Sequence, residues 1–321
     1  MSRANRNFVP LGVSLIALAL GAGSGGCGTT VGNPMVALEI QGTAPGTLSA
    51  PIAFPSLARL TAPLYGPVSA LASPRRDSIL SAASAATIEV EVSDANGDPI
   101  GTLTLDTARL ALEEITIETD DSETKDPDFP GPYIVNLVTN TVEPALGTIQ
   151  LPAGTYKQIQ LKLAKTEDGD VPSSDDLFKR SIYVEGTYSG EAGGSTRTDI
   201  PFTMAFDLDE EFQLTPTGGT SAGISLAAGE NATIIVAFRL NRWLRFNDGE
   251  TNSDGLDFDN LSVGGGEIVL DEDASGDDEK IREVIKENIK ISADYGKDAN
   301  GDGELESSED DDSDPHDEGD D

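Results

Sequence analysis

A twelve-residue run near the end of the chain, residues 298–309, has the residue types and spacing of a calcium-binding loop. It matches the EF-hand pattern, in which acids or amides occupy alternate positions, glycine occupies position 6 and glutamate occupies position 12. Because Ca²⁺ is a hard cation that takes roughly six to eight oxygen ligands, the pattern predicts Ca²⁺ as the bound ion. The predicted ligands, which include a main-chain carbonyl at position 7 and a water-bridged carboxylate at position 9, are Asp298, Asn300, Asp302, Glu304, Glu306 and Glu309.

Composition offers a second explanation for this pattern, because 22 of the last 51 residues are Asp or Glu. Spaced carboxylates arise by chance in such a segment. Composition explains neither Gly303 at position 6, which permits a sharp turn, nor Leu305 at position 8, which we expect to dock the loop on the domain. We therefore expect a defined site rather than a diffuse cloud of carboxylates.

The flanks of this loop predict only half of an EF-hand. Before it, residues 277–293 carry one apolar stripe at helical spacing, formed by Ile281, Val284, Ile285 and Ile289. We expect Ser275 or Asp277 to cap this entering helix and Gly296 to loosen its junction with the loop. After the loop, residues 310–315 are too acidic to form an exiting helix.

A second, weaker metal candidate lies in the acidic loop 248–259, one of three acidic loops with those at 120–128 and 167–176. Its glycines at positions 249 and 255 are misplaced for an EF-hand loop, and a solvated acidic loop is the alternative. The candidate ligands are Asp248, Glu250, Asn252, Asp254 and Asp259.

The start of the chain predicts export and lipid attachment. Residues 1–26 have a basic n-region, an apolar stretch over 8–20 and a run of small residues. That apolar stretch is shorter than the roughly 20 residues that a membrane span needs. Cys27, the only cysteine, follows directly, and Ser24-Gly25-Gly26-Cys27 resembles a lipobox with serine in place of the usual leucine. We expect Cys27 to carry the lipid.

Charge and the residue after the cysteine bear on location. The formal net charge of −36 excludes electrostatic binding to nucleic acid or anionic lipid, so membrane attachment must come from acyl chains on Cys27. Gly28 stands where an aspartate would signal retention in the inner membrane, which favours the outer membrane of a bacterial cell envelope. With one cysteine, the fold has no internal disulfide.

The middle of the chain predicts a mainly β protein. Residues 86–270 alternate apolar and polar residues with period two, and Asn96-Gly97 indicates a hairpin rather than a metal site built on Asp94, Asn96 and Asp98. About ten short strands indicate one antiparallel β-sandwich of the immunoglobulin or transthyretin type with a short C-terminal helix. The expected strands after Ile88–Val92 cover 102–105, 109–118, 133–138, 148–151, 155–163, 181–188, 200–208, 224–227, 232–244 and 267–270.

These patterns divide the chain into five parts. Residues 1–26 form the signal peptide, and 27–85 form a Gly, Ala, Pro and Ser-rich tether with one candidate strand at 36–40. The sandwich is expected over 86–270 and to be separable from both ends. The helix and calcium loop cover 271–309, and a disordered acidic tail covers 310–321.

A family resemblance rests on residues 112–163. The strand Tyr133-Ile134-Val135-Asn136-Leu137 and the run Leu151-Pro152-Ala153-Gly154-Thr155-Tyr156 resemble an uncharacterised β-sandwich domain family of bacterial lipoproteins with an LPAGTY motif. The resemblance implies a location in the cell envelope and no known activity. We expect Pro152–Gly154 to form a turn with Tyr156 packed over it. Gln160 stands where that family often has arginine, so no role transfers there.

Catalysis is hard to assemble from this sequence, and we expect no enzyme. The single histidine, His316, lies in the acidic tail, which leaves no Ser-His-Asp, Cys-His or His-Glu-x-x-His arrangement. Trp243 is expected at the edge of the core rather than in a sugar-binding cleft. The leading function is a lipid-anchored envelope protein with a binding or structural sandwich, a Ca²⁺ loop and an envelope protein or polysaccharide partner. The alternatives are an adhesin or matrix protein with diffuse cation binding and a carboxylate-dependent glycoside hydrolase.

Overall fold

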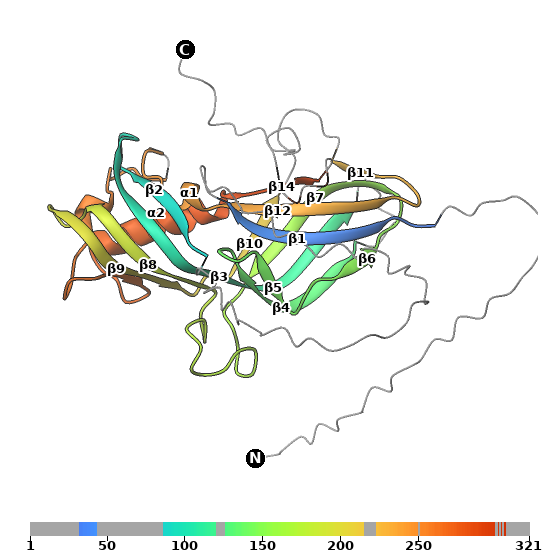
Figure 1. Ribbon diagram of the computed structural model, residues 1–321, viewed down its shortest axis with the longest axis horizontal. Coiled ribbons are helices and arrows are strands. Elements are labelled where there is room, and N and C mark those ends of the chain that lie inside the picture. The colour runs from blue at the N-terminus through green and yellow to red at the C-terminus, as the bar shows by residue number, and fades with distance from the viewer. Residues whose placement is uncertain are drawn as a thin grey trace, which may run out of the picture. The chain divides into compact units, whose positions relative to one another are not determined.

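The computed structural model describes residues 32–43, 86–119, 126–214, 223–249 and 251–298, together with residues 301, 303 and 305. This part of the chain is mainly β and confirms the predicted β-sandwich (Figure 1). The strands are β1 Met35–Thr43, β2 Ile88–Ser93, β3 Pro99–Thr119, β4 Asp128–Asn136, β5 Thr141–Glu143, β6 Thr148–Gln150, β7 Gly154–Leu163, β8 Ile182–Glu191, β9 Thr196–Phe206, β10 Glu210–Leu214, β11 Ile224–Leu226, β12 Asn231–Arg239, β13 Ile268–Asp271 and β14 Ala293–Lys297. The helices are α1 Leu240–Trp243, the 3₁₀ helix η1 Phe258–Asn260 and α2 Asp277–Lys290.

The strands form two sheets of unequal size. The smaller, sheet A, has the order β14-β12-β1-β6. The larger, sheet B, is built around β3, which pairs with β2 and β8 in its first half and with β4 and β7 in its second. The pairings are antiparallel except those of β1 with β12 and of β13 with β9, which are parallel. Sheet A and helix α2 lie on sheet B, as Figure 1 shows.

Strand β3 replaces two of the predicted strands. The ranges 102–105 and 109–118 were expected as separate strands, but they are one strand of 21 residues. Its register shifts between Leu105 and Thr107, so one extra residue is accommodated there as a bulge without ending the strand. A bulge keeps the chain extended while it changes the face on which the following side chains point. The polar residue between Leu105 and Thr107 therefore lies in a bulge and does not mark a turn.

The core lies between the sheets and follows the alternation seen in the sequence. Ile159, Leu161 and Leu163 of β7 are buried, as predicted, whereas the residues between them are half-buried. Phe238 of sheet A meets Phe212 of sheet B edge to face, with ring centroids 6.4 Å apart. The side chains of both sheets and of α2 belong to one continuous cluster.

Helix α2 contains the predicted apolar stripe but ends earlier than expected. Ile281, Ile285 and Ile289 are fully buried against the core. The N-cap is Gly276 with φ +69°, and no side chain caps the helix, so the expected cap at Ser275 or Asp277 is wrong. The helix stops at Lys290, and β14 leads into the candidate calcium loop in place of a helix.

Two strands outside residues 86–270 complete the sandwich. β1 pairs along its whole length with β12, and β14 pairs with the other edge of the same strand. The predicted limits of the sandwich are therefore too narrow at both ends. The candidate strand 36–40 belongs to sheet A and not to a tether.

Two turns have the predicted form. The Asp94 carboxylate accepts hydrogen bonds from the backbone N–H groups of Asn96 and Asp98, both at 2.8 Å, and Gly97 has φ +89°. This side chain therefore closes its own hairpin, as Asp does in turns. In the second turn the Tyr156 hydroxyl donates to the Pro152 carbonyl at 2.7 Å. Tyr156 is buried over this turn, as expected.

Candidate metal centre

The first predicted calcium ligand, Asp298, lies where β14 leaves sheet A. Its backbone N–H donates to the Thr233 carbonyl at 3.0 Å, which continues the pairing with β12 for one more residue. Its carboxylate accepts hydrogen bonds from Gly301 N at 2.5 Å and Gly303 N at 3.1 Å. Each carboxylate oxygen has a further lone pair, so these bonds leave the group able to bind a cation.

Two contacts dock this loop on the outer face of sheet A. Leu305 is only 7% exposed and packs with Ile235 and Ala237 of β12, which confirms the docking role predicted for position 8. The Gln41 side-chain amide of β1 donates to the Gly303 carbonyl at 2.6 Å. Gly301 and Gly303 have φ values of +78° and +79°, a region that favours glycine. Asp298 and Leu305, two of the described residues of this run, thus both lie against β12.

The remaining predicted ligands are not placed by the structure. Asn300, Asp302, Glu304, Glu306 and Glu309 lie outside the described residues, as does the lipidation candidate Cys27. Within the described ranges, no three His, Cys, Asp or Glu side chains are grouped so as to hold a metal ion.

The described members of the second candidate set face different partners. Asn252 is 5% exposed, and its amide donates to the Phe246 and Leu256 carbonyls while its oxygen accepts from Leu256 N. Asp254 pairs with Lys280 at 2.8 Å, and Asp259 accepts from Gly194 N at 3.0 Å. The Asp248 carbonyl accepts from Asn252 N, and Glu250 lies outside the described residues. The described groups therefore fold the loop and do not converge on one point.

The same acidic loop supplies an aromatic core residue. Phe258 of η1 is fully buried, and its ring lies 5.0 Å from that of Tyr188, 5.8 Å from Phe202 and 5.7 Å from Phe246, measured between centroids. Burial raises the pKa of the Tyr188 hydroxyl, which donates to the Glu191 carbonyl. The sequence analysis did not identify this cluster, although Phe258 is an apolar residue between two acids.

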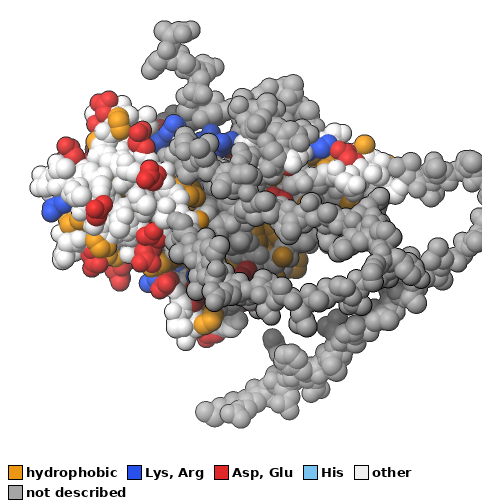
Figure 2. Space-filling model, viewed as in Figure 1, with side chains coloured by type: hydrophobic (Ala, Val, Ile, Leu, Met, Phe, Trp, Pro, Cys, Tyr) orange, Lys and Arg blue, Asp and Glu red, His pale blue; other side chains and the backbone are white. Residues whose placement is uncertain are grey.

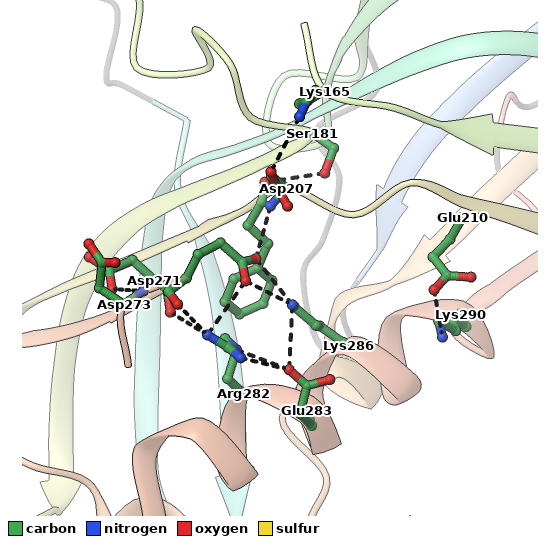
Figure 3. A network of polar contacts seen from close by, with 12 residues as sticks. Lys165, Ser181, Asp207, Glu210, Asp271, Asp273, Arg282, Glu283, Lys286 and Lys290 are labelled. Carbon is green, nitrogen blue, oxygen red and sulfur yellow. Dashed lines mark hydrogen bonds and ion pairs between the residues drawn. The ribbon is translucent and has the colours of Figure 1, made fainter. Parts of the chain in front are cut away.

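An ion network attaches helix α2 to the end of β13 (Figure 3). Glu272 accepts from the backbone N–H of Asp207 and pairs with Lys286 at 3.1 Å and Arg282 at 3.5 Å. Burial alone would raise the pKa of Glu272, but these donors outweigh it and lower the pKa. Arg282 is buried and also donates to the carbonyls of Asp271 and Glu272. The network holds the helix and has no feature of a ligand site.

A groove of about 660 Å³ is lined by residues of β3, β4 and β7 and of the segments that follow β7 and β9. Lys162 on its wall pairs with Glu113 at 2.6 Å, and Lys165 pairs with Asp207 at 3.7 Å. A glycosidase would need an acid with a raised pKa beside a second carboxylate. In the part of the chain that the structure describes, the carboxyl groups with displaced pKa values are Asp94, Asp175, Glu230 and Glu272, and each pKa is lowered.

Where the face seen in Figure 2 is not covered by grey atoms, Asp and Glu side chains are scattered over the surface, with some Lys and Arg among them. Among these elements, no helix has the length and apolar character to cross a membrane.

Comparison with known proteins gives a match to one family model, over much of the sandwich. No curated protein and no solved structure matches the chain. The model of the family described as "Domain of unknown function (DUF4382)" matches residues 85–259, more than half of the 321 residues, from β2 to η1. The chain therefore belongs to the DUF4382 family.

Proposed function

We propose that this protein is a non-enzymatic, lipid-anchored protein of the bacterial cell envelope, with a binding or structural β-sandwich and a C-terminal Ca²⁺ loop. The main support is the docked start of the loop. Asp298, at position 1, holds the backbone at positions 4 and 6, and Leu305, at position 8, is buried against β12. A solvated acidic run needs neither contact, whereas a loop that wraps an ion needs its ends held.

The affinity for Ca²⁺ should be weak. Sheet A, Gln41 and Leu305 hold the described part of the loop. The sequence supplies no exiting helix and no paired loop, which preorganise the ligands in sensor proteins. We therefore expect a dissociation constant of about 10⁻⁴ to 10⁻³ M, the range of extracellular modules. Mg²⁺ should compete poorly because it demands near-octahedral geometry and dehydrates reluctantly.

Calorimetric titration of two charge-matched variants tests this site. Glu309→Gln removes the carboxylate at position 12, whereas Asp311→Asn makes the same change of charge outside the loop. We expect one saturable Ca²⁺ site in the wild type, a loss of about tenfold or more in affinity for Glu309→Gln, and little change for Asp311→Asn.

Equal, small losses in the two variants would mean that the carboxylates act as a diffuse counterion cloud. The protein would then fit the alternative of an acidic adhesin or matrix component, whose many weak sites are screened by salt.

The anchor is tested separately by Cys27→Ser. Because Cys27 is the only cysteine and the chain is strongly acidic, acyl chains are the attachment that the sequence supports. We expect the wild type in the membrane pellet after a high-salt wash and the serine variant in the soluble fraction. A serine variant that stays in the washed pellet would contradict lipidation at this position.

A further inference from the structure

The groove beside Lys162 lies on the face of sheet B that points away from the core. Leu161 and Leu163 of β7 are buried in the core, so Lys162 between them points to the opposite face. Strand β3 changes its partner from β8 to β7 at Ala111, which lines the groove. Residues 164–170, which follow β7, contribute much of the remaining lining. The groove therefore lies beside this change of strand partner.

Charge in the groove is unbalanced. Its lining has five carboxylates and two lysines, so its formal charge is −3. The two lysines are already in ion pairs, one of which, between Lys165 and Asp207, can be followed in Figure 3. Among the residues that the structure describes, no lysine or arginine pairs with Glu167, Asp170 or Asp209. We call these three exposed carboxylates the acidic rim.

The acidic rim suits a ligand with several separated positive charges. Within the described ranges, no three acidic side chains are grouped around one point, so these carboxylates do not converge on a single ion. The lining also has apolar surface, from the exposed Pro132 and the half-buried Ala164. Its volume of about 660 Å³ lies within the range of about 300–1,000 Å³ that is usual for small-molecule pockets. A flexible aliphatic chain with charged nitrogens matches both the spacing and the apolar surface.

The groove already contains one alkylammonium group, that of Lys162. Its Nζ lies 2.6 Å from the Glu113 carboxylate. The hydrogen bond and the charge of Glu113 raise the pKa of Lys162, and the negative charge of Asp209 raises it further. The charged form of an amine is therefore favoured at this place in the structure.

We propose that this groove binds a linear aliphatic polyamine, whose ammonium groups pair with the acidic rim and whose methylene groups lie on Pro132 and Ala164. This site does not depend on the calcium loop or on the lipid anchor, because the groove contains none of their residues. The ligand class is a cation that is recognised by its spacing and its apolar chain as well as by its charge.

Calorimetric titration of spermidine into the full chain, in EDTA, tests the site. We expect one saturable site that an equal concentration of Mg²⁺ does not displace, because Mg²⁺ keeps its waters and gains nothing from apolar surface. The double variant Glu167→Gln, Asp209→Asn should lose about fivefold or more in affinity. Its matched control is Glu89→Gln, Asp98→Asn, which makes the same chemical changes at two exposed residues outside the groove and should change the affinity little.

A third variant should strengthen binding, which a misfolded protein would not do. Lys162→Gln removes the partner of Glu113 and leaves one more carboxylate for the ligand, so the affinity for spermidine should rise. Lys280→Gln, which breaks the 2.8 Å pair with Asp254 outside the groove, should leave the affinity unchanged. The proposal is overturned if the wild type shows no saturable site, if both double variants lose affinity equally, or if Lys162→Gln does not bind more tightly. Displacement by equal Mg²⁺ also overturns it, since spermidine would then act as one counterion among many.

Discussion

A fragment of residues 86–270 is expected to lose cooperative unfolding, although the alternation of apolar residues is strongest there. The fragment lacks β1 and β14, which are the two neighbours of β12 in sheet A. It also lacks helix α2, whose buried isoleucines belong to the common core. A lone β12 cannot satisfy its backbone groups or cover the inner face of sheet B. The fragment should therefore behave as a loosely packed state that binds hydrophobic dyes.

A longer fragment, residues 32–305, is the matched control because it retains every described element. It should show a β-type circular dichroism spectrum and one cooperative thermal transition, whereas the fragment 86–270 should show a broad, low-amplitude change. Equal transition midpoints for the two fragments would mean that sheet A contributes little stability. The core would then have to be complete within residues 86–270.

Truncation of Phe258 is expected to be the most damaging single substitution in the acidic loop. The ring is fully buried and contacts three other aromatic rings, so Phe258→Ala leaves a large cavity. Substitutions of this kind lower the free energy of unfolding by about 3–5 kcal/mol. The whole free energy of unfolding of a typical domain is only about 5–15 kcal/mol. The full chain with Phe258→Ala should therefore unfold at a much lower denaturant concentration than the wild type, as measured at the midpoint of the transition.

Phe178→Ala makes the same chemical change at a half-buried position and is the matched control. Phe178→Ala should lower the free energy of unfolding clearly less than Phe258→Ala does, because a half-buried ring leaves a smaller cavity and water can fill the space. The comparison also examines the second metal candidate. If Phe258→Ala lowers the free energy of unfolding only when Ca²⁺ is present, the packing of this aromatic ring depends on an ion bound in the acidic loop.

Local patterns in the sequence determine which elements form and which way their side chains face. Alternation over 155–163 places Ile159, Leu161 and Leu163 in the core. Apolar residues three and four apart predict the buried stripe of α2, and Leu305 at loop position 8 predicts the docking of the loop. The alternation and the helical stripe depend on residues close together in the chain, because backbone geometry sets their period.

Tertiary structure alone decided which strands complete the sandwich and where charge is buried. β1 is a single short strand in a Pro- and Gly-rich region, and its partner β12 lies almost 200 residues later. Asp294 became a buried acid because β12, α1 and β14 bring Arg239 and Arg242 against it. Phe258 entered the core from a loop whose composition indicates a solvated surface. Strand partners and charge partners far apart in the chain leave no periodic trace, because their interaction free energy exists only once the sheets have packed.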